Sequence, residues 1–469
     1  MTNSIELTVN RTSKVSLAEQ IRLGIETLIL SGLLQEGDRL PSWLVLASQL
    51  GVSRGTVKIA YDRLVDRQFV SASKSCGTRV IYKRKIIPEH KAPPKLGSFM
   101  DTYLKMTKNQ GMFQLGVPSK ENFPAKAFAR IRAQAVRHES SGWGFYPDPR
   151  GEYELRREIA AYLAIARGIE CSPEQVFINS GFCSGLGVSL KALKINSGRA
   201  WVEDPGFPLA KHALVVAGLD VVPIPVDESG INIELATQKA ADAVLAVVTP
   251  GQQAPLGMPL SLERRLALLA WAAANNSWVI EDDYLGELQL DGKPTPALFS
   301  LDTAGRVIHL GTFSKTINPQ LRIGFAVVPR SLIDVYAEGA AALFLTPAPS
   351  MQLSILRFIR EGHFLRHLQR SRRLYSAQRD ELHTNLDHLG LKAKTAGLSV
   401  LVELEQHLDD LQIVSQAYKI GLSPTPLSIW YHQQEHAPSG LLLGIASSAK
   451  SFIPKACEQL FQLLQTSSK

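Results

Sequence analysis

The sequence predicts a multidomain protein. We expect a small α+β head with a helix–turn–helix and a wing, followed by a larger α/β body with a mostly parallel central sheet and a smaller C-terminal α+β subdomain. Two observations predict this: residues 1–80 combine helical periodicity with a closing hairpin, whereas later residues contain apolar runs typical of buried parallel strands. The charge divides in the same way. Residues 1–112 carry 17 Lys and Arg against 9 Asp and Glu, and the remainder carries 34 of each. A basic module joined to a neutral one is typical of a nucleic-acid-binding head on an enzyme-like body.

The chain of 469 residues is long enough for both parts to bury a core. We expect the head at residues 1–80, a linker at 81–112 and the body at 113–469. The linker contains Pro93-Pro94 and few consecutive apolar residues, so a tether is expected there. The smaller subdomain is expected from about Met351 to the C-terminus.

In the head, Leu17, Ile21, Ile25 and Leu28 repeat at helical spacing. Ser42 then provides a helix cap, and a short helix through Leu46 and Ala47 follows. The turn at residues 51–53 leads into a helix from Arg54 to about Arg67, and a hairpin over residues 69–80 closes the unit with Lys74 at its tip. In a helix–turn–helix, the second helix can enter the DNA major groove.

The head resembles the GntR winged-helix family through L-P-S at residues 40–42, L-G-V-S-R-G-T-V at 50–57 and G-T-R-V at 77–80. The resemblance implies contacts to double-stranded promoter DNA from eight residues, although each alone could be a solvated surface side chain. These are Ser42, Ser53, Arg54, Thr56, Lys58, Lys74, Thr78 and Arg79. One departure concerns Leu44, near which the family places a DNA-contacting arginine. We expect weakened or altered operator contact there, for which Lys74 and Arg79 could compensate.

The most informative segment of the body is Gly311–Gly324. An apolar strand, Val307–Leu310, precedes Lys315, which lies among small hydroxylated residues, and Arg322 follows seven positions later. A lysine amine forms a Schiff base with an aldehyde cofactor, and hydroxyls with an arginine fork hold a phosphate. The alternative for Lys315 alone is a surface lysine in a Ser/Thr loop.

About thirty residues upstream, Trp278-Val279-Ile280 predicts a buried parallel strand that ends in acids. Ligands bind at the carboxyl ends of such strands. A helix N-terminal acid cluster is the competing interpretation. Together these segments resemble the pyridoxal 5'-phosphate (PLP) motifs of class I aminotransferases, which have fold type I. That resemblance implies that Asp282 pairs with the pyridine nitrogen, with Asp283 as its rival, and that Tyr284 contacts the ring hydroxyl.

Further matches follow in the family's order. Tyr146–Gly151 precedes an amphipathic helix, and a glycine-containing turn after the strand Val176–Asn179 presents backbone amides to an anion. Phe182, Cys183 and Ser184 stand where the family has glutamines. Thr249–Gly257 follows a strand expected at Ala243–Val248, with Gln252 replacing a histidine. By resemblance, the phosphate contacts are Thr312, Ser314, Arg322, Gly181, Phe182 and Cys183. Phe207 would stack on the ring, although an ordinary core aromatic is nearly as good an interpretation.

The whole pattern is similar to the MocR type of GntR regulators, in which a winged-helix head is fused to an aminotransferase-like domain. It implies a homodimer that binds promoter DNA and senses PLP, or a small amine or amino acid, through Lys315. The alternative is an active aminotransferase with a DNA-binding head, so enzymatic activity stays open. Against ordinary transamination, residues 419–450 hold no arginine that could clamp a substrate carboxylate. A body that no longer holds PLP is a second alternative.

Cys76, Cys171, Cys183 and Cys457 are the only cysteines, and none has the spacing of a metal site. Free thiols in a reducing cytoplasm are therefore expected. The sequence has neither a signal peptide nor an apolar run long enough to cross a bilayer, so no membrane partner is expected.

Overall fold

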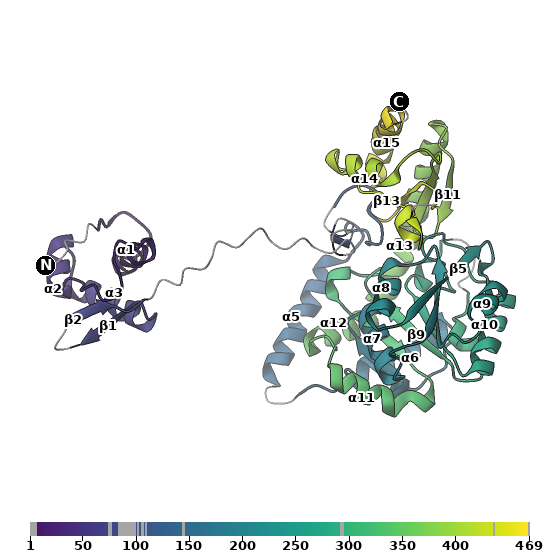
Figure 1. Ribbon diagram of the computed structural model, residues 1–469, viewed down its shortest axis with the longest axis horizontal. Coiled ribbons are helices and arrows are strands. Elements are labelled where there is room, and N and C mark those ends of the chain that lie inside the picture. The colour runs from purple at the N-terminus through teal and green to yellow at the C-terminus, as the bar shows by residue number, and fades with distance from the viewer. Residues whose placement is uncertain are drawn as a thin grey trace. The chain divides into compact units, whose positions relative to one another are not determined.

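The computed structural model describes residues 7–73, 77–82, 100, 103–104, 107, 110–142, 146–290, 295–434 and 437–467. Contacts divide the chain into two compact units, Met1–Ser98 and Phe99–Lys469, which are drawn in Figure 1. Lys74, Cys76 and most of the predicted linker lie outside the described residues.

The first unit contains the predicted helices and hairpin. Its elements are α1 (Leu17–Ser31), α2 (Trp43–Leu50), α3 (Arg54–Asp66), β1 (Val70–Ser73) and β2 (Gly77–Val80). The side chains of Ser16, Ser42 and Ser53 accept hydrogen bonds from backbone amides in the first turns of α1, α2 and α3. Serine caps therefore begin all three helices, and the cap at Ser42 is the one that the sequence predicted.

The core of the head is apolar and continuous. Ile21 and Ile25 of α1 pack with Leu46 of α2 and with Val57 and Leu64 of α3, and all five are fully buried. Strands β1 and β2 pair antiparallel from Val70↔Val80 to Ser73↔Gly77. This three-helix core with a hairpin fixes α3 so that its other face remains exposed.

The second unit is built on a mixed sheet of eight strands in the order β3-β10-β9-β8-β7-β4-β5-β6. The strands β4, β5, β7, β8 and β9 are parallel, whereas β10 is antiparallel to both of its neighbours and β6 is antiparallel to β5. Their bounds are β3 Val176–Asn179, β4 Arg199–Asp204, β5 Asp220–Asp227, β6 Gly230–Ile231, β7 Leu245–Val248, β8 Trp278–Asp283, β9 Val307–Thr312 and β10 Gly324–Val327. The mostly parallel sheet confirms the predicted α/β body.

Helices cover both faces of this sheet, as buried parallel strands require. One hydrophobic cluster joins a face of the sheet to α7, α8 and α11. A second cluster contains α5, α6, α12 and α13, and a third contains α9 and α10. Their bounds are α5 Ala125–Ser141, α6 Tyr153–Ala166, α7 Phe182–Ala192, α8 Pro208–Val216, α9 Ile233–Ala240, α10 Leu262–Asn275, α11 Ile333–Leu343, α12 Pro349–Arg360 and α13 His363–His388.

The smaller C-terminal sheet has the order β11-β12-β14-β13, and its neighbouring strands pair antiparallel. The remaining elements are β11 Ala393–Ala396, β12 Ser399–Glu403, α14 Asp410–Lys419, β13 Thr425–Pro426, β14 Gly440–Gly444 and α15 Ile453–Ser467. They gather at one end of the second unit (Figure 1).

This subdomain departs from the predicted start near Met351 in two ways. Helix α12, which contains Met351, packs against α5, with the rings of Phe128 and Phe358 5.4 Å apart. In addition, the chain at residues 112–114 joins the small sheet, because Met112 bridges Leu422 and the Gly444 amide donates to the Phe113 carbonyl at 2.8 Å. The subdomain is therefore assembled from two distant stretches of sequence.

Candidate functional site

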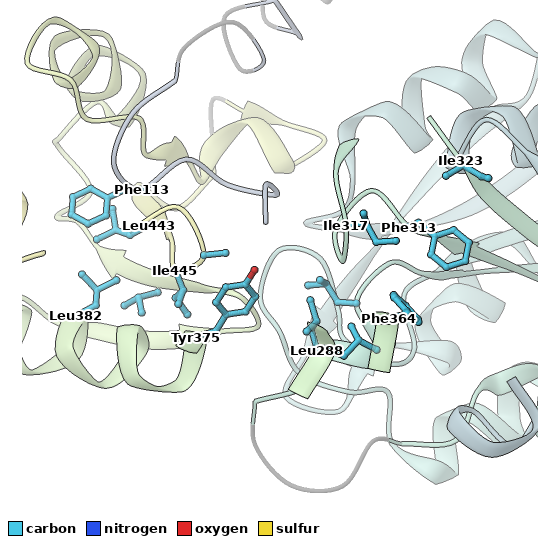
Figure 2. Packing of buried hydrophobic residues seen from close by; sticks show 14 of the residues in the cluster. Phe113, Leu288, Phe313, Ile317, Ile323, Phe364, Tyr375, Leu382, Leu443 and Ile445 are labelled. Carbon is cyan, nitrogen blue, oxygen red and sulfur yellow. The ribbon is translucent and has the colours of Figure 1, made fainter. Parts of the chain in front are cut away.

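Lys315 lies in the connection between β9 and β10. Its neighbours Phe313 and Ile317 are both 2% exposed and point into the core cluster that contains Phe364 from α13 (Figure 2). The ring centroids of Phe313 and Phe364 are 5.7 Å apart. Because the residues on either side of Lys315 are anchored, the connection holds the lysine at the carboxyl end of the parallel strands.

The amine of Lys315 is half-buried and donates a hydrogen bond to the Gly116 carbonyl at 3.1 Å. Burial lowers the pKa of Lys315; the nearby Asp282 carboxylate opposes that shift, and Arg322 adds to it. Gly116 has φ 73°, and a Cβ at this position would lie 2.7 Å from Nζ. Gly116 is thus needed for the lysine to approach this backbone, a contact that the sequence reading missed.

The two candidate acids lie on opposite faces of β8, because successive side chains alternate in a strand. Asp283 contacts Arg167, whose Nε lies 2.6 Å from Oδ2. Asp282 instead interacts electrostatically with Lys315. The structure therefore brings Asp282, rather than Asp283, to the side of the lysine.

Asp282 is only 7% exposed. Burial raises the pKa of Asp282 to about 8; Asp283 adds to the rise and Lys315 opposes it. Burial also raises the pKa of Tyr284, and the Asp282 carboxylate adds to that rise, so the two side chains interact. A buried acid whose pKa is strongly shifted and that interacts with a nearby lysine is typical of a functional site.

The predicted anion turn lies beside Arg322. Gly181 has φ 106° and precedes α7, and a Cβ at this position would lie 3.7 Å from Nη2 of Arg322. The Asn179 side-chain oxygen accepts a hydrogen bond from the Gly181 amide at 2.8 Å and holds the turn. Since a helix N-terminus offers unpaired amides and positive potential, this turn and Arg322 together suit a phosphate.

The other predicted cofactor contacts differ in how far they are buried. Cys183 is exposed and Phe182 is half-buried, with its ring centroid 5.9 Å from that of Phe207. Phe207 also lies 6.1 Å from the ring of Trp430. Thr312 and Ser314 are half-buried next to Lys315, and the Thr312 hydroxyl accepts a hydrogen bond from the Ser314 amide at 3.1 Å.

Two further polar residues, Glu203 and His367, were not assigned a role from the sequence, whereas Gln252 was expected to stand in place of a histidine. Glu203 is buried and accepts hydrogen bonds from the Thr249 hydroxyl at 2.5 Å and the Thr249 amide at 3.1 Å. Burial raises its pKa to about 7. His367 of α13 is fully buried, and its Nε2 lies 2.7 Å from the carbonyl oxygen of Thr316, directly after Lys315. Gln252 is buried, and its Oε1 has no partner among the described residues.

In the head, the predicted DNA contacts divide into two kinds. The Ser42 and Ser53 hydroxyls cap α2 and α3, and the Thr56 hydroxyl lies 2.7 Å from the Ser53 hydroxyl. Arg54 and Lys58 are exposed on α3. Cationic side chains on an exposed helix after a tight turn suit a recognition helix.

On the wing, Thr78 is half-buried, and exposed Arg79 donates to the Gly37 carbonyl at 2.7 Å. Arg39 lies close to Gly77, where a Cβ would be 2.8 Å from its Nε. Arg39 therefore adds a cation beside the hairpin, which its turn position in the sequence did not reveal. In place of the family's arginine, Trp43, Leu44 and Val45 are 42%, 43% and 58% exposed.

Comparisons with known proteins agree with this division. Residues 17–80 match the model of the bacterial regulatory proteins of the gntR family, and residues 114–424 match aminotransferase class I and II. Among solved structures, an archaeal alanine:glyoxylate aminotransferase covers 79% of this chain and 96% of its own, with a TM-score of 0.72 and 23% identity. A Pyrococcus horikoshii kynurenine aminotransferase has a TM-score of 0.69 at 24% identity and covers 80% of this chain and 96% of its own. These structures establish the fold of the body.

Relatives that share both parts are also found. The probable rhizopine catabolism regulatory protein MocR of Rhizobium meliloti is 32% identical over 94% of this chain and 92% of its own length. The pyridoxine biosynthesis transcriptional regulator PdxR of Corynebacterium glutamicum is 31% identical over 95% of this chain and 96% of its own.

The head and the body thus define a DNA-binding regulator with an aminotransferase-fold domain. More particularly, the chain belongs to the MocR type of the GntR family of transcriptional regulators. In the described part of the chain, no helix combines the length and apolar character that a membrane span requires. No group of three His, Cys, Asp or Glu suited to a metal ion occurs within those residues.

Proposed function

We propose that this regulator binds promoter DNA through its winged-helix head and binds PLP at Lys315. The convergence of Lys315, Asp282 and Arg322 carries the proposal. Asp282 is buried, and its charge interacts with the amine of Lys315. Arg322 interacts electrostatically with the same amine and lies beside the amide turn at Gly181.

The residues fit PLP in type and position. PLP supplies an aldehyde that condenses with a primary amine and a pyridine ring that withdraws electrons. The Asp282 carboxylate would accept a hydrogen bond from the protonated ring nitrogen. Tyr284 would contact the ring hydroxyl, and Phe207 would pack on the ring. The phosphate would be held by Arg322 and the amides of Gly181, Phe182 and Cys183, with the hydroxyls of Thr312 and Ser314.

The regulator is favoured over an ordinary aminotransferase because residues 419–450 contain no arginine. Without that fork, a substrate carboxylate lacks the expected bidentate partner. The proposed effector is therefore PLP itself or a small amine. The names of the relatives include both pyridoxine biosynthesis and rhizopine catabolism, which fits either ligand.

Ligand binding would regulate DNA binding only if two states of the protein bind the ligand with different affinity. We propose that these are two arrangements of a homodimer in the cytoplasm. Exposed aromatic and aliphatic side chains on the body support a partner surface, among them Tyr146 at 97%, Phe344 at 43% and Leu345 at 40% exposed.

The test of cofactor binding is an absorption titration of the full chain with PLP. A visible band characteristic of lysine-bound PLP is expected in the wild type and in Lys394→Ala, which changes an exposed lysine of β11. The band should be absent in Lys315→Ala. A band that persists in Lys315→Ala would overturn the lysine assignment, and no band in the wild type would favour a body that does not hold PLP.

DNA binding is tested with the same protein by gel shift. Upstream promoter DNA should bind more tightly than random DNA, and binding should weaken steeply with salt because phosphate contacts release counterions. Equal affinity for both DNAs would contradict a sequence-specific regulator.

A further inference from the structure

A buried group of four charged residues lies behind Asp282, and the proposed cofactor contacts make no use of it. Glu281 and Asp283 of β8, His309 of β9 and Arg167 after α6 are each 7% exposed or less. Glu281 lies opposite His309 in the parallel register of the two strands. We refer to these four residues as the rear charge cluster.

Hydrogen bonds and ion pairs connect the cluster. The Nδ1 of His309 lies 3.0 Å from Oε2 of Glu281, and its Nε2 lies 3.8 Å from Oδ2 of Asp283. That same Oδ2 is 2.6 Å from Nε of Arg167. The Glu281 carboxylate also accepts amide hydrogen bonds from Leu298 at 2.7 Å and Phe299 at 3.0 Å.

The fold makes room for these charges. A Cβ on Gly286 would lie 2.7 Å from Arg167 Cζ, and one on Gly251 would lie 3.2 Å from its Nη2. Arg167 Nη1 donates to the Thr295 carbonyl at 2.7 Å. Because two glycines and a backbone carbonyl accommodate the guanidinium, the cluster is a specific feature of this site.

Charge balance determines the protonation state of His309. Two carboxylates and one guanidinium leave one uncompensated negative charge in a buried place, which is costly. A protonated His309 removes that imbalance. Burial acts against the imidazolium, but the Glu281 and Asp283 carboxylates raise the pKa of His309 above its usual value. Burial raises the pKa of the neighbouring Glu287 to about 7, so its neutral form adds no charge below that pH.

Asp282 follows Glu281 on β8 and lies opposite Leu310, the residue after His309, in the register of β8 and β9. Asp283 and Glu203 disfavour ionisation of Asp282, whereas Lys315 and His309 favour it. These are the charged groups that face Asp282 from β4, β8, β9 and the Lys315 connection. When Lys315 loses its charge to the cofactor, His309 remains as a cation on the opposite side.

We propose that His309, held as an imidazolium between Glu281 and Asp283, is a positioning residue that keeps Asp282 ionised toward the ring nitrogen of the cofactor. The inference rests on the proposed PLP site and deepens it. An ionised Asp282 keeps the ring nitrogen protonated, and the resulting positive charge lowers the pKa of the nitrogen that joins Lys315 to the cofactor.

The experiment follows the visible band of the PLP-loaded full chain as a function of pH. His309→Asn retains a donor for Glu281 but removes the positive charge. The pH midpoint of the band should rise by about one unit, a tenfold change in proton affinity. The Glu281→Gln, His309→Asn double variant restores neutrality and should return the midpoint toward the wild-type value. In an Asp282→Asn background, His309→Asn should add little, because the residue through which it acts is gone.

The outcomes separate the two proposals. If the wild type forms no band, the proposed function fails. If the wild type forms the band but His309→Asn leaves its midpoint unchanged, or the double variant stays as displaced as the single one, the positioning role is overturned. Should His309→Asn fail to fold, His309→Gln tests the same idea, because it also removes the positive charge and keeps an amide donor. It should raise the midpoint in the same direction, and an unchanged midpoint would contradict the proposal.

Discussion

The DNA-binding face of the head and the Lys315 site of the body use charged residues in opposite ways. On the head, Arg54 and Lys58 are exposed on α3, in contact with solvent. In the body, Asp282 and Glu203 are buried, and burial raises the pKa of both. An exposed cation contributes through screened attraction that adds up with its neighbours, whereas a buried charge depends on one particular partner. Substitutions of buried charged residues in the body should therefore have large effects on stability. Substitutions of exposed residues in the head should have smaller effects on DNA affinity.

The largest effect is expected on the buried acids of β8. Asp283→Asn leaves Arg167 without its carboxylate, and breaking such a buried pair costs about 3–5 kcal/mol of unfolding free energy. Asp282→Asn should leave stability much less affected, because burial already disfavours the charged form of Asp282. Urea unfolding measures both. The exposed pair of Glu403 and Lys394 supplies a control, since Glu403→Gln should cost no more than about 1 kcal/mol. Equal losses for Asp282→Asn and Asp283→Asn would contradict the two-face arrangement.

Glu203 should make the stability of the body depend on pH. Burial raises its pKa from 4.5 to about 7, so the folded protein binds a proton that the unfolded chain releases earlier. Its contribution is present below pH 4.5 and is lost as the pH rises through 7, by up to about 3 kcal/mol. Unfolding at pH 5, 6 and 7 should show this decline in the wild type and a flatter profile in Glu203→Gln. Parallel profiles would show that Glu203 does not titrate in this range.

On the head, Arg54→Ala should weaken binding to promoter DNA by about 1–3 kcal/mol, which is roughly fivefold to 150-fold. Arg330 is an exposed arginine on the body, so Arg330→Ala is a suitable control that should bind as the wild type does. Fluorescence anisotropy at several salt concentrations measures both the affinity and the salt slope. An unchanged affinity for Arg54→Ala would remove α3 as the recognition helix.

The smallest effect is a gain. Leu44 is 43% exposed, near the position where the resemblance to the GntR family implies an arginine, so Leu44→Arg should add one phosphate contact. The salt slope should steepen by about one, and affinity at low salt should rise by about tenfold or less. Leu44→Gln, which adds polarity without charge, should do neither. If both variants behave alike, this position does not face the DNA backbone.

The sequence could predict those features that local signals determine. The capping serine at 42 and the turn at residues 51–53 predict the starts of α2 and α3, and the strand Val307–Leu310 was correctly predicted apart from its extension to Thr312. Lys315 follows such a strand, so its place at the sheet edge was also predictable.

Features that depend on packing could not be predicted. Whether Asp282 or Asp283 turns toward the lysine depends on which face of β8 is covered, and the partner of Asp283 is Arg167, 116 residues away in sequence. The Gly116 carbonyl lies 199 residues from Lys315. Helix α12 was assigned to the wrong subdomain because its apolar face fits α5, which periodicity alone does not reveal. The roles of Asp282, Tyr284 and Arg322 in PLP binding, and the DNA contacts, remain predictions.

The central claim is that occupancy at Lys315 changes how the head binds DNA. The direct measurement is the affinity of the full chain for its upstream promoter DNA, titrated with PLP, in the wild type and in Lys315→Ala. The wild-type affinity should change with PLP along the same curve as its visible absorption band, and the affinity of Lys315→Ala should not follow PLP. A wild-type affinity that stays constant while the band develops would contradict the account.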